Sequence, residues 1–416
     1  MKKIGQAVRK EEYQEQSEYL NTVHSSSKGW ITKAEINKSG FNQRHYKYKE
    51  LLQQEFNKEN TYISLNTFYS TYRRLEYLKE LKAHFIDLDT YKTGFTKTQI
   101  LMNLEENHFN KTIPRPNLIV DSGRGIYLIW LINSVPSKAL PLWKAVEEYL
   151  YSVLKPFGAD RQALDPTRVL RVPGSINSKS KSIVEVIEQY DYIYDLREIQ
   201  NNFLPELDEN RPKKKGRPCK KVFIHRERSL YYARIQDIVK LCELRGYDLK
   251  GHRELVLFLY RYYLCSFLED TQKALDDVLE LNSEFVSPLR ENEVIRATRS
   301  AEKVYLSKDK QYKYKNKTLI ELLEITELEE TYMTTIISNK EYKRRENIRV
   351  KKAYQEKLKA EGKMRKKEEL ELLRVKIKSL REKGFKNKEI MQMLGITSTT
   401  TFERHITYMK KNGLLR

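Results

Sequence analysis

The stretch that most constrains the fold is Phe85-Ile-Asp-Leu-Asp89, an apolar segment with two aspartates. This alternation favours a β-strand, on which side chains two residues apart point to the same face, roughly 6–7 Å from each other. Two like charges held side by side are costly unless cations neutralise them. The spacing of Asp87 and Asp89 therefore favours a site for Mg²⁺ or Mn²⁺. For this pair taken alone, two solvated acids at a strand end are the alternative.

Strands and helices are both expected around this segment. Strands are expected over 62–68, 84–89, 117–121 and 126–132, and helices over 72–82 and 137–154. Residues 1 to about 60 are polar and have the composition of helices. Strands separated by helical segments predict an α+β or α/β domain of about 200 residues, and we expect the α+β class for the chain.

A second motif, Ser122-Gly-Arg-Gly125, connects two of the expected strands. Gly123 and Gly125 let the backbone come close to a phosphate, while Ser122 and Arg124 supply hydrogen-bond donors. These residues therefore suit a nucleotide. A plain hairpin turn between two strands accounts for them equally well.

A third motif lies between Gly158 and Lys179 and combines acids with cations. Asp160 and Asp165 come first, and the cations that follow, around a Pro-Gly turn, are Arg168, Arg171 and Lys179. One of the acids could complete a metal site while the cations hold phosphates. A surface turn with ion pairs is the alternative for this motif alone.

In this order, the three motifs resemble those of the archaeo-eukaryotic primase superfamily, and most closely the primase-polymerases of plasmids, phages and mobile elements. The resemblance covers residues 60–200. It implies that Asp87, Asp89 and Asp160 hold the catalytic metals, with Asp165 as the other candidate for the third acid. The nucleotide-binding residues that it implies are Ser122, Gly123, Arg124, Gly125, Tyr127, Arg168, Arg171 and Lys179.

Tyr127 is a departure from the superfamily pattern. The second motif of the superfamily often has a histidine there that contacts the incoming nucleotide. A phenol can donate a hydrogen bond but is not a cation at neutral pH. The resemblance therefore implies weaker nucleotide binding at this position, or a degenerate site.

Composition and charge narrow the class of protein. The 416 residues include 78 Lys and Arg against 57 Asp and Glu, which gives a net charge of +21. This excess indicates a polyanionic partner, nucleic acid before membrane. No apolar run reaches the roughly 18–20 residues of a membrane-spanning helix. Three widely spaced cysteines exclude a disulfide framework and a CxxC zinc site, so we expect a cytoplasmic protein.

The chain divides into six expected segments. They are a catalytic domain with a helical N-terminal extension (1–205), a basic linker (206–221), a helical domain (222–308), a first helix-turn-helix-like repeat (309–345), a basic helical connector (346–383) and a second helix-turn-helix repeat (384–416). The helical domain resembles the one that follows such primases. In the linker, Lys213-Lys-Lys-Gly-Arg-Pro218 resembles an AT-hook, which would place Arg217 in a minor groove. A flexible basic linker is the alternative.

The repeats are recognised because residues 314–326 align without gaps on 385–397. In the second copy, residues 387–394 read as a first helix, 395–397 as a turn and 398–411 as a recognition helix. The inward-facing residues would be Phe402, Ile406 and Met409, and the DNA-binding residues Lys386, Lys388, Thr399, Thr400, Arg404 and His405. In the first copy, the helix expected over 327–337 begins with glutamates that would repel phosphates, so we expect it to serve mainly in packing or in a protein contact.

Together these features predict a replication primase of a bacterial mobile element such as a plasmid or phage. This nucleotidyltransferase would use Mg²⁺ or Mn²⁺ to synthesise primers on single-stranded DNA. Its expected partners are a single-stranded DNA template, duplex DNA at a replication origin, nucleoside triphosphates and a replicative helicase, and no membrane. The alternative is a non-catalytic DNA-binding replication initiator or regulator built on a primase-like scaffold. The complete set of acids favours the enzyme.

Overall fold

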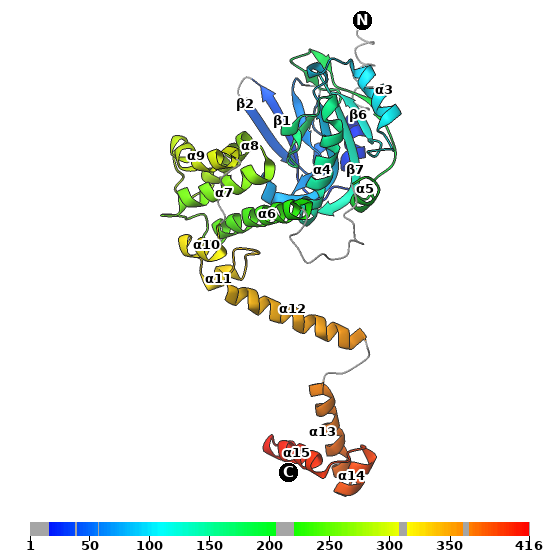
Figure 1. The fold of residues 1–416 in the computed structure, drawn as a ribbon, viewed down its shortest axis with the longest axis vertical. Coiled ribbons are helices and arrows are strands. Elements are labelled where there is room, and N and C mark those ends of the chain that lie inside the picture. The colour runs from blue at the N-terminus through cyan, green and yellow to red at the C-terminus, as the bar shows by residue number, and fades with distance from the viewer. Residues whose placement is uncertain are drawn as a thin grey trace. The chain divides into compact units, whose positions relative to one another are not determined.

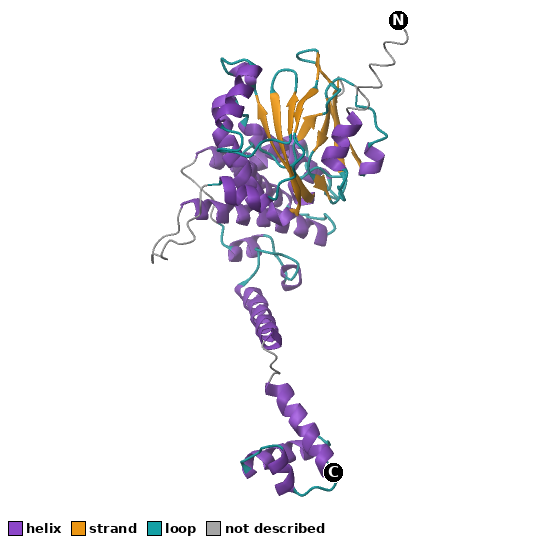
Figure 2. Ribbon diagram, turned by 90° about the vertical axis from the view of Figure 1, so that its right-hand side faces the viewer, coloured by secondary structure: helices purple, strands orange, loops and turns teal. Residues whose placement is uncertain are grey.

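The computed structural model describes residues 16–37, 40–56, 58–204, 220–307, 314–360 and 366–415. The chain forms two compact units, residues 1–336 and residues 337–416. The N-terminal unit contains every strand in the described residues together with helices up to α11, and the C-terminal unit consists of helices α12–α15 (Figures 1 and 2).

The described strands of the N-terminal unit all lie before α5 (Leu196–Phe203), and the described elements after it are helices. Its strands are β1 (Ile31–Asn37), β2 (Gly40–Tyr46), β3 (Thr61–Ser64), β4 (Thr67–Phe68), β5 (Leu78–Leu88), β6 (Leu118–Asp121), β7 (Ile126–Pro136), β8 (Val169–Arg171), β9 (Ile176–Asn177), β10 (Ser182–Ile183) and β11 (Glu185–Gln189). Its helices are α2 (Tyr48–Leu51), α3 (Lys97–Asn107), α4 (Leu140–Leu154), α5 (Leu196–Phe203), α6 (Lys220–Leu244), α7 (Arg253–Leu268), α8 (Thr271–Ser283), α9 (Glu291–Ser307), α10 (Asn316–Leu322) and α11 (Glu327–Glu330).

Two antiparallel sheets form the α+β part of this unit. The first has five strands in the order β11-β6-β7-β5-β4, and the second has four in the order β2-β1-β3-β8. β9 and β10 make a separate hairpin. Antiparallel sheets with helices on one side are the α+β arrangement, so the expected fold class is confirmed.

Helix α4 covers one face of the five-stranded sheet. Trp143 donates from Nε1 to the carbonyl oxygen of Ala83 at 2.9 Å, and Glu147 accepts from His84 Nδ1 at 2.7 Å. Since successive residues of a strand alternate between faces, His84 and Asp87 point to opposite faces of β5. Asp87 is paired with Tyr127 in the β5–β7 register, so these two side chains share the face away from α4.

Two of the expected helical segments are wrong. Among the described residues up to 60, only 16–24 and α2 are α-helical, and a β1–β2 hairpin follows the first of them. The helix expected over 72–82 is a 3₁₀ turn at 75–77 and the start of β5. The charged residues of that segment suggested a solvated helix, but Glu80 is buried and accepts from Gly29 N and Thr67 Oγ1, while buried Lys82 donates to Ser26 Oγ.

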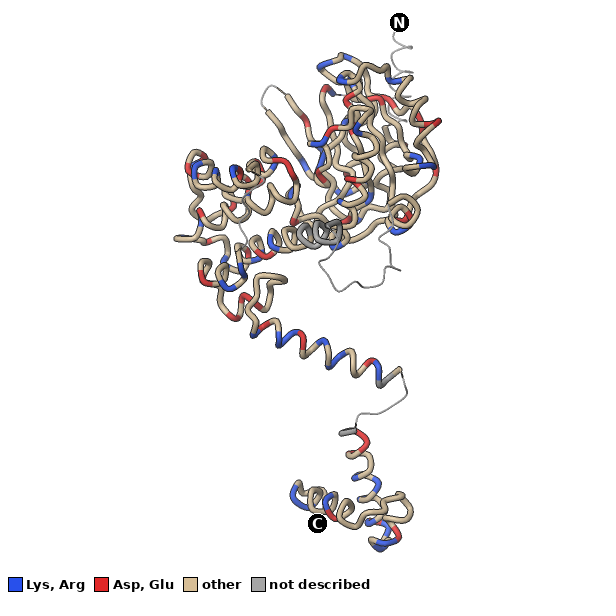
Figure 3. The backbone as a smooth tube through the Cα atoms, in the orientation of Figure 1, with Lys and Arg blue, Asp and Glu red and all other residues tan. Residues whose placement is uncertain are grey.

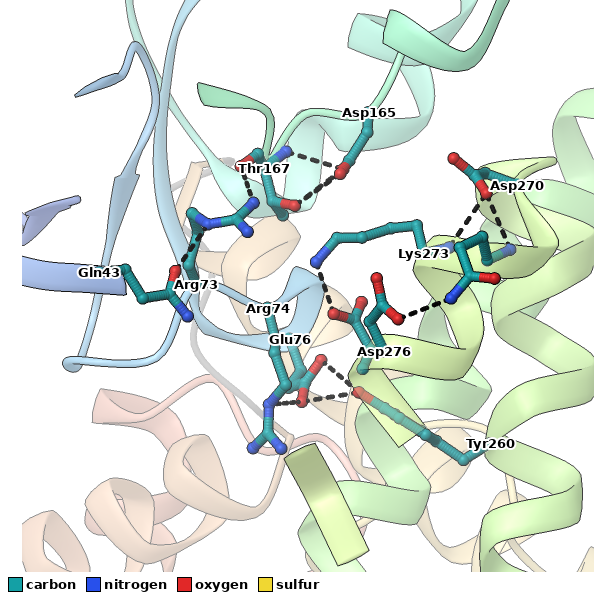
Figure 4. A network of polar contacts seen from close by, with 12 residues as sticks. Gln43, Arg73, Arg74, Glu76, Asp165, Thr167, Tyr260, Asp270, Lys273 and Asp276 are labelled. Atoms are coloured by element: carbon teal, nitrogen blue, oxygen red, sulfur yellow. Dashed lines mark hydrogen bonds and ion pairs between the residues drawn. The ribbon is translucent and has the colours of Figure 1, made fainter. Parts of the chain in front are cut away.

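Helices α6–α9 form a bundle that is joined to the α+β part by a buried polar network. Arg74 has no exposed surface, and its guanidinium pairs with Glu76 at 2.9 Å and with Glu284 at 2.6 Å. Tyr260 of α7 donates to Glu76 at 2.9 Å. Figure 4 shows Arg74, Glu76 and Tyr260 of this network between the ribbon that carries Arg74 and the helices of the bundle. Because a buried charge without its partner is strongly destabilising, the network fixes the bundle against the sheets.

The first repeat packs against α6 within the N-terminal unit. Its second helix, expected over 327–337, ends at Glu330, and the next residues hold a buried carboxylate. Asp237 of α6 accepts from the backbone N–H groups of Thr334, Thr335 and Ile336 at 2.6–2.8 Å. Glu329 pairs with Arg245 at 2.7 Å. The segment in the place of a recognition helix is therefore docked on the bundle.

The C-terminal unit contains α12 (Asn339–Ala360), α13 (Lys366–Glu382), α14 (Asn387–Met393) and α15 (Thr399–Lys411). The last three share a small core of Ile377, Ile390, Phe402 and Met409. α14 and α15 agree closely with the two helices expected for the second repeat. Figure 3 shows Lys and Arg along α12 and around α15. Among the described helices, none is long and apolar enough to cross a membrane.

Candidate active site

The three acids of the first and third motifs meet at the end of β5. The turn that follows α4 lies antiparallel to this end, with a bridge between Leu88 and Ala159. Asp160 donates its N–H to the carbonyl oxygen of Asp87 at 2.8 Å, and Asp89 donates its N–H to Gly158 O at 2.9 Å. The backbone therefore places Asp160 beside Asp87, in β5, and Asp89, which directly follows the strand.

The carboxyl group of Asp87 has a raised pKa. Burial, followed by the charge of Asp89, raises its pKa to about 7, and Asp160 acts in the same direction. The guanidinium groups of Arg168 and Arg171 act in the opposite direction. Among the described residues, no group donates a hydrogen bond to the Asp87 carboxylate. A cation stabilises a partly buried carboxylate that has other acids beside it, and a bound metal ion would supply that positive charge.

The carboxylate of Asp89 is paired with a lysine three residues later in the chain. Lys92 Nζ lies 2.5 Å from Asp89 Oδ2, and the Lys92 side chain is 59% exposed. Surface ion pairs between residues three apart are weak, typically below about 1 kcal/mol, so a divalent cation can displace this ammonium. The carboxylate is thus accessible to a metal ion.

The Ser122–Gly125 turn is pressed against the end of β5. A Cβ atom at Gly125 would lie 2.3 Å from the carbonyl oxygen of Leu88, so only glycine allows this approach. Gly123 has a φ of 95°, which also favours glycine, and Ser122 N donates to Gly125 O at 3.0 Å. Ser122 is buried, whereas Arg124 is exposed and stacks over the Tyr91 ring at 4.0 Å. Of the donors expected in this turn, Arg124 has the accessible side chain.

Arg171 joins the two sheets beside Asp87. Its guanidinium lies over the Tyr62 ring at 4.9 Å and donates to the Tyr127 hydroxyl at 3.4 Å. Tyr127 is buried, and burial together with the Asp87 charge raises its pKa, so the phenol stays protonated. Arg168 donates to Gln162 O at 3.1 Å. Both arginines therefore lie close enough to Asp87 to act on its charge, and Tyr127 contacts Arg171.

The β9–β10 hairpin closes the opposite side of the glycine turn. Asn177 donates from Nδ2 to Ser122 O at 2.6 Å and accepts from the N–H of Lys179 at 3.0 Å. Lys179 itself is exposed. The hairpin therefore presents this lysine next to the turn that carries Gly123.

Asp165 lies away from the three acids. Its carboxylate is buried and accepts from the N–H of Thr167 at 2.8 Å and from the Thr167 hydroxyl. Its charge acts on Asp277 of α8, whose pKa is raised to about 7, mainly by burial. Figure 4 shows Asp165 and Thr167 opposite the start of α8. Of the two candidates for the third acid, the structure brings Asp160 to Asp87.

The expected DNA-binding residues of the second repeat fall into two groups. Thr399, Thr400 and Arg404 are exposed on α15, and Lys386 and Lys388 are exposed at the start of α14. His405 is buried, and burial lowers its pKa, so its expected exposure is wrong. The helical period places it on the inner face with Phe402 and Met409. Arg217 lies outside the described residues.

The residues present suit a divalent metal only in part. Asp87, Asp89 and Asp160 supply hard oxygen donors of the kind that Mg²⁺ and Mn²⁺ prefer. Within the described part of the chain, however, no three acidic, His or Cys side chains close around one point as a complete ligand set. Mg²⁺ is commonly held by one or two carboxylates together with substrate phosphates and water. The three acids are compatible with such a shared site.

Three further residues belong to this site by geometry. Lys97 Nζ donates to Gly123 O at 2.8 Å and pairs with Asp121, so α3 anchors the glycine turn. Lys92 and Tyr91 lie beside Asp89. Lys92 could have been found from the sequence, because it follows Asp89 by three residues. Lys97 could not, because its role depends on a contact with Gly123, 26 residues away.

Comparison with known proteins adds the family. No protein-family model matches the chain. Over 397 residues the chain is 70% identical to a "Replication protein" of Clostridium perfringens, covering 95% of this chain and 97% of that protein. The chain belongs to this family of replication proteins.

Solved primases are among the structures similar to this chain. The primase-polymerase domain of cyanophage S-2L is 15% identical with a TM-score of 0.35, over 46% of this chain and 97% of that one. Primase RepB′ is 11% identical with a TM-score of 0.32, over 70% of this chain and 93% of that one. Its catalytic domain in complex with initiator DNA has a TM-score of 0.31 at 11% identity, over 46% of this chain and 93% of that domain.

Proposed function

We propose that this chain is a replication primase of a bacterial mobile element that synthesises primers on single-stranded DNA by metal-dependent nucleotidyl transfer. The observation that supports this most directly is the meeting of Asp87, Asp89 and Asp160 under two arginines. Acids of this kind bind divalent cations, and the arginines bind phosphates. Membership of a replication-protein family agrees with this role.

In this proposal each group has a separate task. Asp87, Asp89 and Asp160 hold Mg²⁺ or Mn²⁺, which when bound neutralises charge on the triphosphate and assists attack by the primer hydroxyl. Arg168 and Arg171 orient the triphosphate from the four-stranded sheet. The exposed Arg124 and Lys179 supply further donors from the opposite side.

The four-stranded sheet offers a surface for the single-stranded template. Its register places Arg171, Tyr62 and Gln43 in one row on the same face, with the buried Ala34 of β1 between Tyr62 and Gln43. Arg73 donates to Gln43 at 3.0 Å, and its guanidinium lies over the Phe41 ring at 5.6 Å. Alternating cations and aromatic rings bind single strands because the cations contact phosphates and the rings stack on bases. We propose that the template runs along this row away from the acids.

The test is primer synthesis by the purified full-length protein. Single-stranded DNA and labelled nucleotides with Mg²⁺ or Mn²⁺ should give short products on a gel. Replacing Asp87 and Asp89 together with Ala should abolish the products while duplex-DNA binding is kept. Replacing Glu291 and Glu293 with Ala is the matched control, because it removes two acids at the same spacing from α9. If the double variant with Ala at both positions made primers at the wild-type rate, the assignment of Asp87 and Asp89 to the metal site would be refuted.

The second candidate function is a non-catalytic DNA-binding replication initiator or regulator. The exposed face of α15 favours DNA binding whether or not the protein is an enzyme. Tyr127, at the position where the superfamily often has a histidine, favours a site with weakened nucleotide binding. A wild-type protein that binds origin duplex but gives no product with any nucleotide or metal would establish this second function instead.

A further inference from the structure

The turn that carries Asp160 is also held from its outer side by the helical bundle. Arg161 follows Asp160 directly, and its guanidinium pairs with the carboxylate of Glu269. The same guanidinium lies over the ring of Tyr151 at 5.1 Å. One residue after the candidate third acid, the chain is therefore attached both to α4 and to the corner between α7 and α8.

That corner has an unusual backbone conformation and is closed by local hydrogen bonds. Glu269 has a φ of 61°, a left-handed conformation that glycine adopts freely and other residues rarely do. Its N–H donates to Cys265 O at 3.0 Å, which closes α7. Asp270 then caps α8, accepting from the N–H groups of Gln272 and Lys273 at 2.9–3.0 Å (Figure 4). A glutamate kept in a strained position with its carboxylate on a neighbouring part of the fold suggests a functional constraint.

The charges of the site explain what such an attachment would do. Asp160 and Asp87 are like charges held side by side, because the Asp160 N–H donates to the carbonyl oxygen of Asp87 at 2.8 Å, and like charges repel. On its inner side the Asp160 turn is held by backbone hydrogen bonds to Asp87 and Asp89. Without a cation, this repulsion acts to move the Asp160 turn away from β5. The pair between Arg161 and Glu269 resists that movement.

We propose that Glu269 is a positioning residue, which through Arg161 keeps Asp160 in place for metal binding and so makes the metal site depend on the helical bundle. This inference rests on the proposed function, since it assigns Asp160 to the metal. It predicts that a change in the bundle, distant from all three acids, weakens the binding of the cation.

The experiment measures Mn²⁺ binding to the full-length protein by the electron paramagnetic resonance signal of free Mn²⁺, without nucleotide. Glu269→Gln removes the charge and keeps the strained conformation, whereas Glu269→Gly removes both. Both variants should bind Mn²⁺ about threefold to tenfold more weakly, a smaller loss than for groups in direct contact with metal ligands. Glu269→Gly should do so with an unchanged or raised melting temperature, because glycine relieves the left-handed backbone.

Two matched controls separate positioning from other causes. Asp270→Asn removes a charge from the adjacent residue while an asparagine still caps α8, so it tests a purely through-space effect. Glu324→Gly makes the same exchange at another left-handed position, with φ of 50° and a side chain 78% exposed. Both controls should bind Mn²⁺ as the wild type does.

The outcomes distinguish this inference from the proposed function. If the wild type binds Mn²⁺ and both Glu269 variants bind it as tightly as the wild type does, the inference is wrong and the proposed function stands. The inference is also wrong if Asp270→Asn weakens binding as much as Glu269→Gln. A wild-type protein that binds no Mn²⁺ either without nucleotide or with a nucleoside triphosphate present, and whose Asp87 variant behaves identically, overturns the proposed function and the inference with it.

Discussion

Replacing Asp87 by asparagine should stabilise the metal-free protein at the same time as it abolishes synthesis. The folded state raises the pKa of this carboxyl from 3.8 to about 7. At about 1.4 kcal/mol per unit, ionising it near neutral pH costs the folded state about 4 kcal/mol. Asparagine avoids this cost, and burying its amide without a partner costs about 1–2 kcal/mol. The net gain should be about 2–3 kcal/mol.

The pH dependence has a definite sign. An acid whose pKa is raised by folding favours the folded state while it is protonated, so this contribution is complete below about pH 4 and disappears as the pH rises through about 7. The advantage of Asp87→Asn should therefore be largest near pH 8 and be mostly lost near pH 4.5. Added Mn²⁺ should stabilise the wild type and not the variant, because bound metal favours the folded state.

Denaturant unfolding at both pH values, in chelator and with Mn²⁺, measures these differences. Asp191→Asn is the matched control, since the same exchange at an exposed carboxyl should give no pH-dependent gain. A variant that is destabilised near pH 8, or that gains equally at both pH values, would refute the electrostatic account of this site.

Three other changes test separate parts of the molecule. Tyr127→Phe removes the hydroxyl that accepts from Arg171, and steady-state kinetics should show a nucleotide KM about twofold to tenfold higher; an unchanged KM would exclude the phenol from the site. Arg404→Ala should weaken duplex-DNA binding by about 1–3 kcal/mol in a fluorescence titration if this residue reads a base, and unchanged binding after truncation at Lys367 would place the DNA site elsewhere. Asp237→Ala leaves three backbone N–H groups without their acceptor, so hydrogen exchange over 316–336 should become much faster while the five-stranded sheet stays protected.

The alternation of apolar and acidic residues, the glycines and the helical periods were sufficient to predict much of this protein. Phe85 to Asp89 indicates a strand whatever surrounds it, because the period of a strand is local, although β5 ends at Leu88 and Asp89 begins the turn that follows. The glycine turn between two strands and the helices 387–393 and 399–411 follow from equally local rules. For the same reason Phe402 and Met409 could be assigned to a core.

Only the tertiary structure decided which acid joins Asp87. The sequence motif favours Asp160 and leaves Asp165 as the second candidate; the bridge between Leu88 and Ala159 brings the first to the strand, while Thr167 binds the second. The β1–β2 hairpin and the start of β5 were missed for a related reason. Their polar residues look solvated until distant partners, such as Gly29 for Glu80, are in place. Local patterns determine which face a side chain occupies, whereas its partner is set by contacts between residues far apart in the chain, and those exist only once the sheets and the bundle have packed.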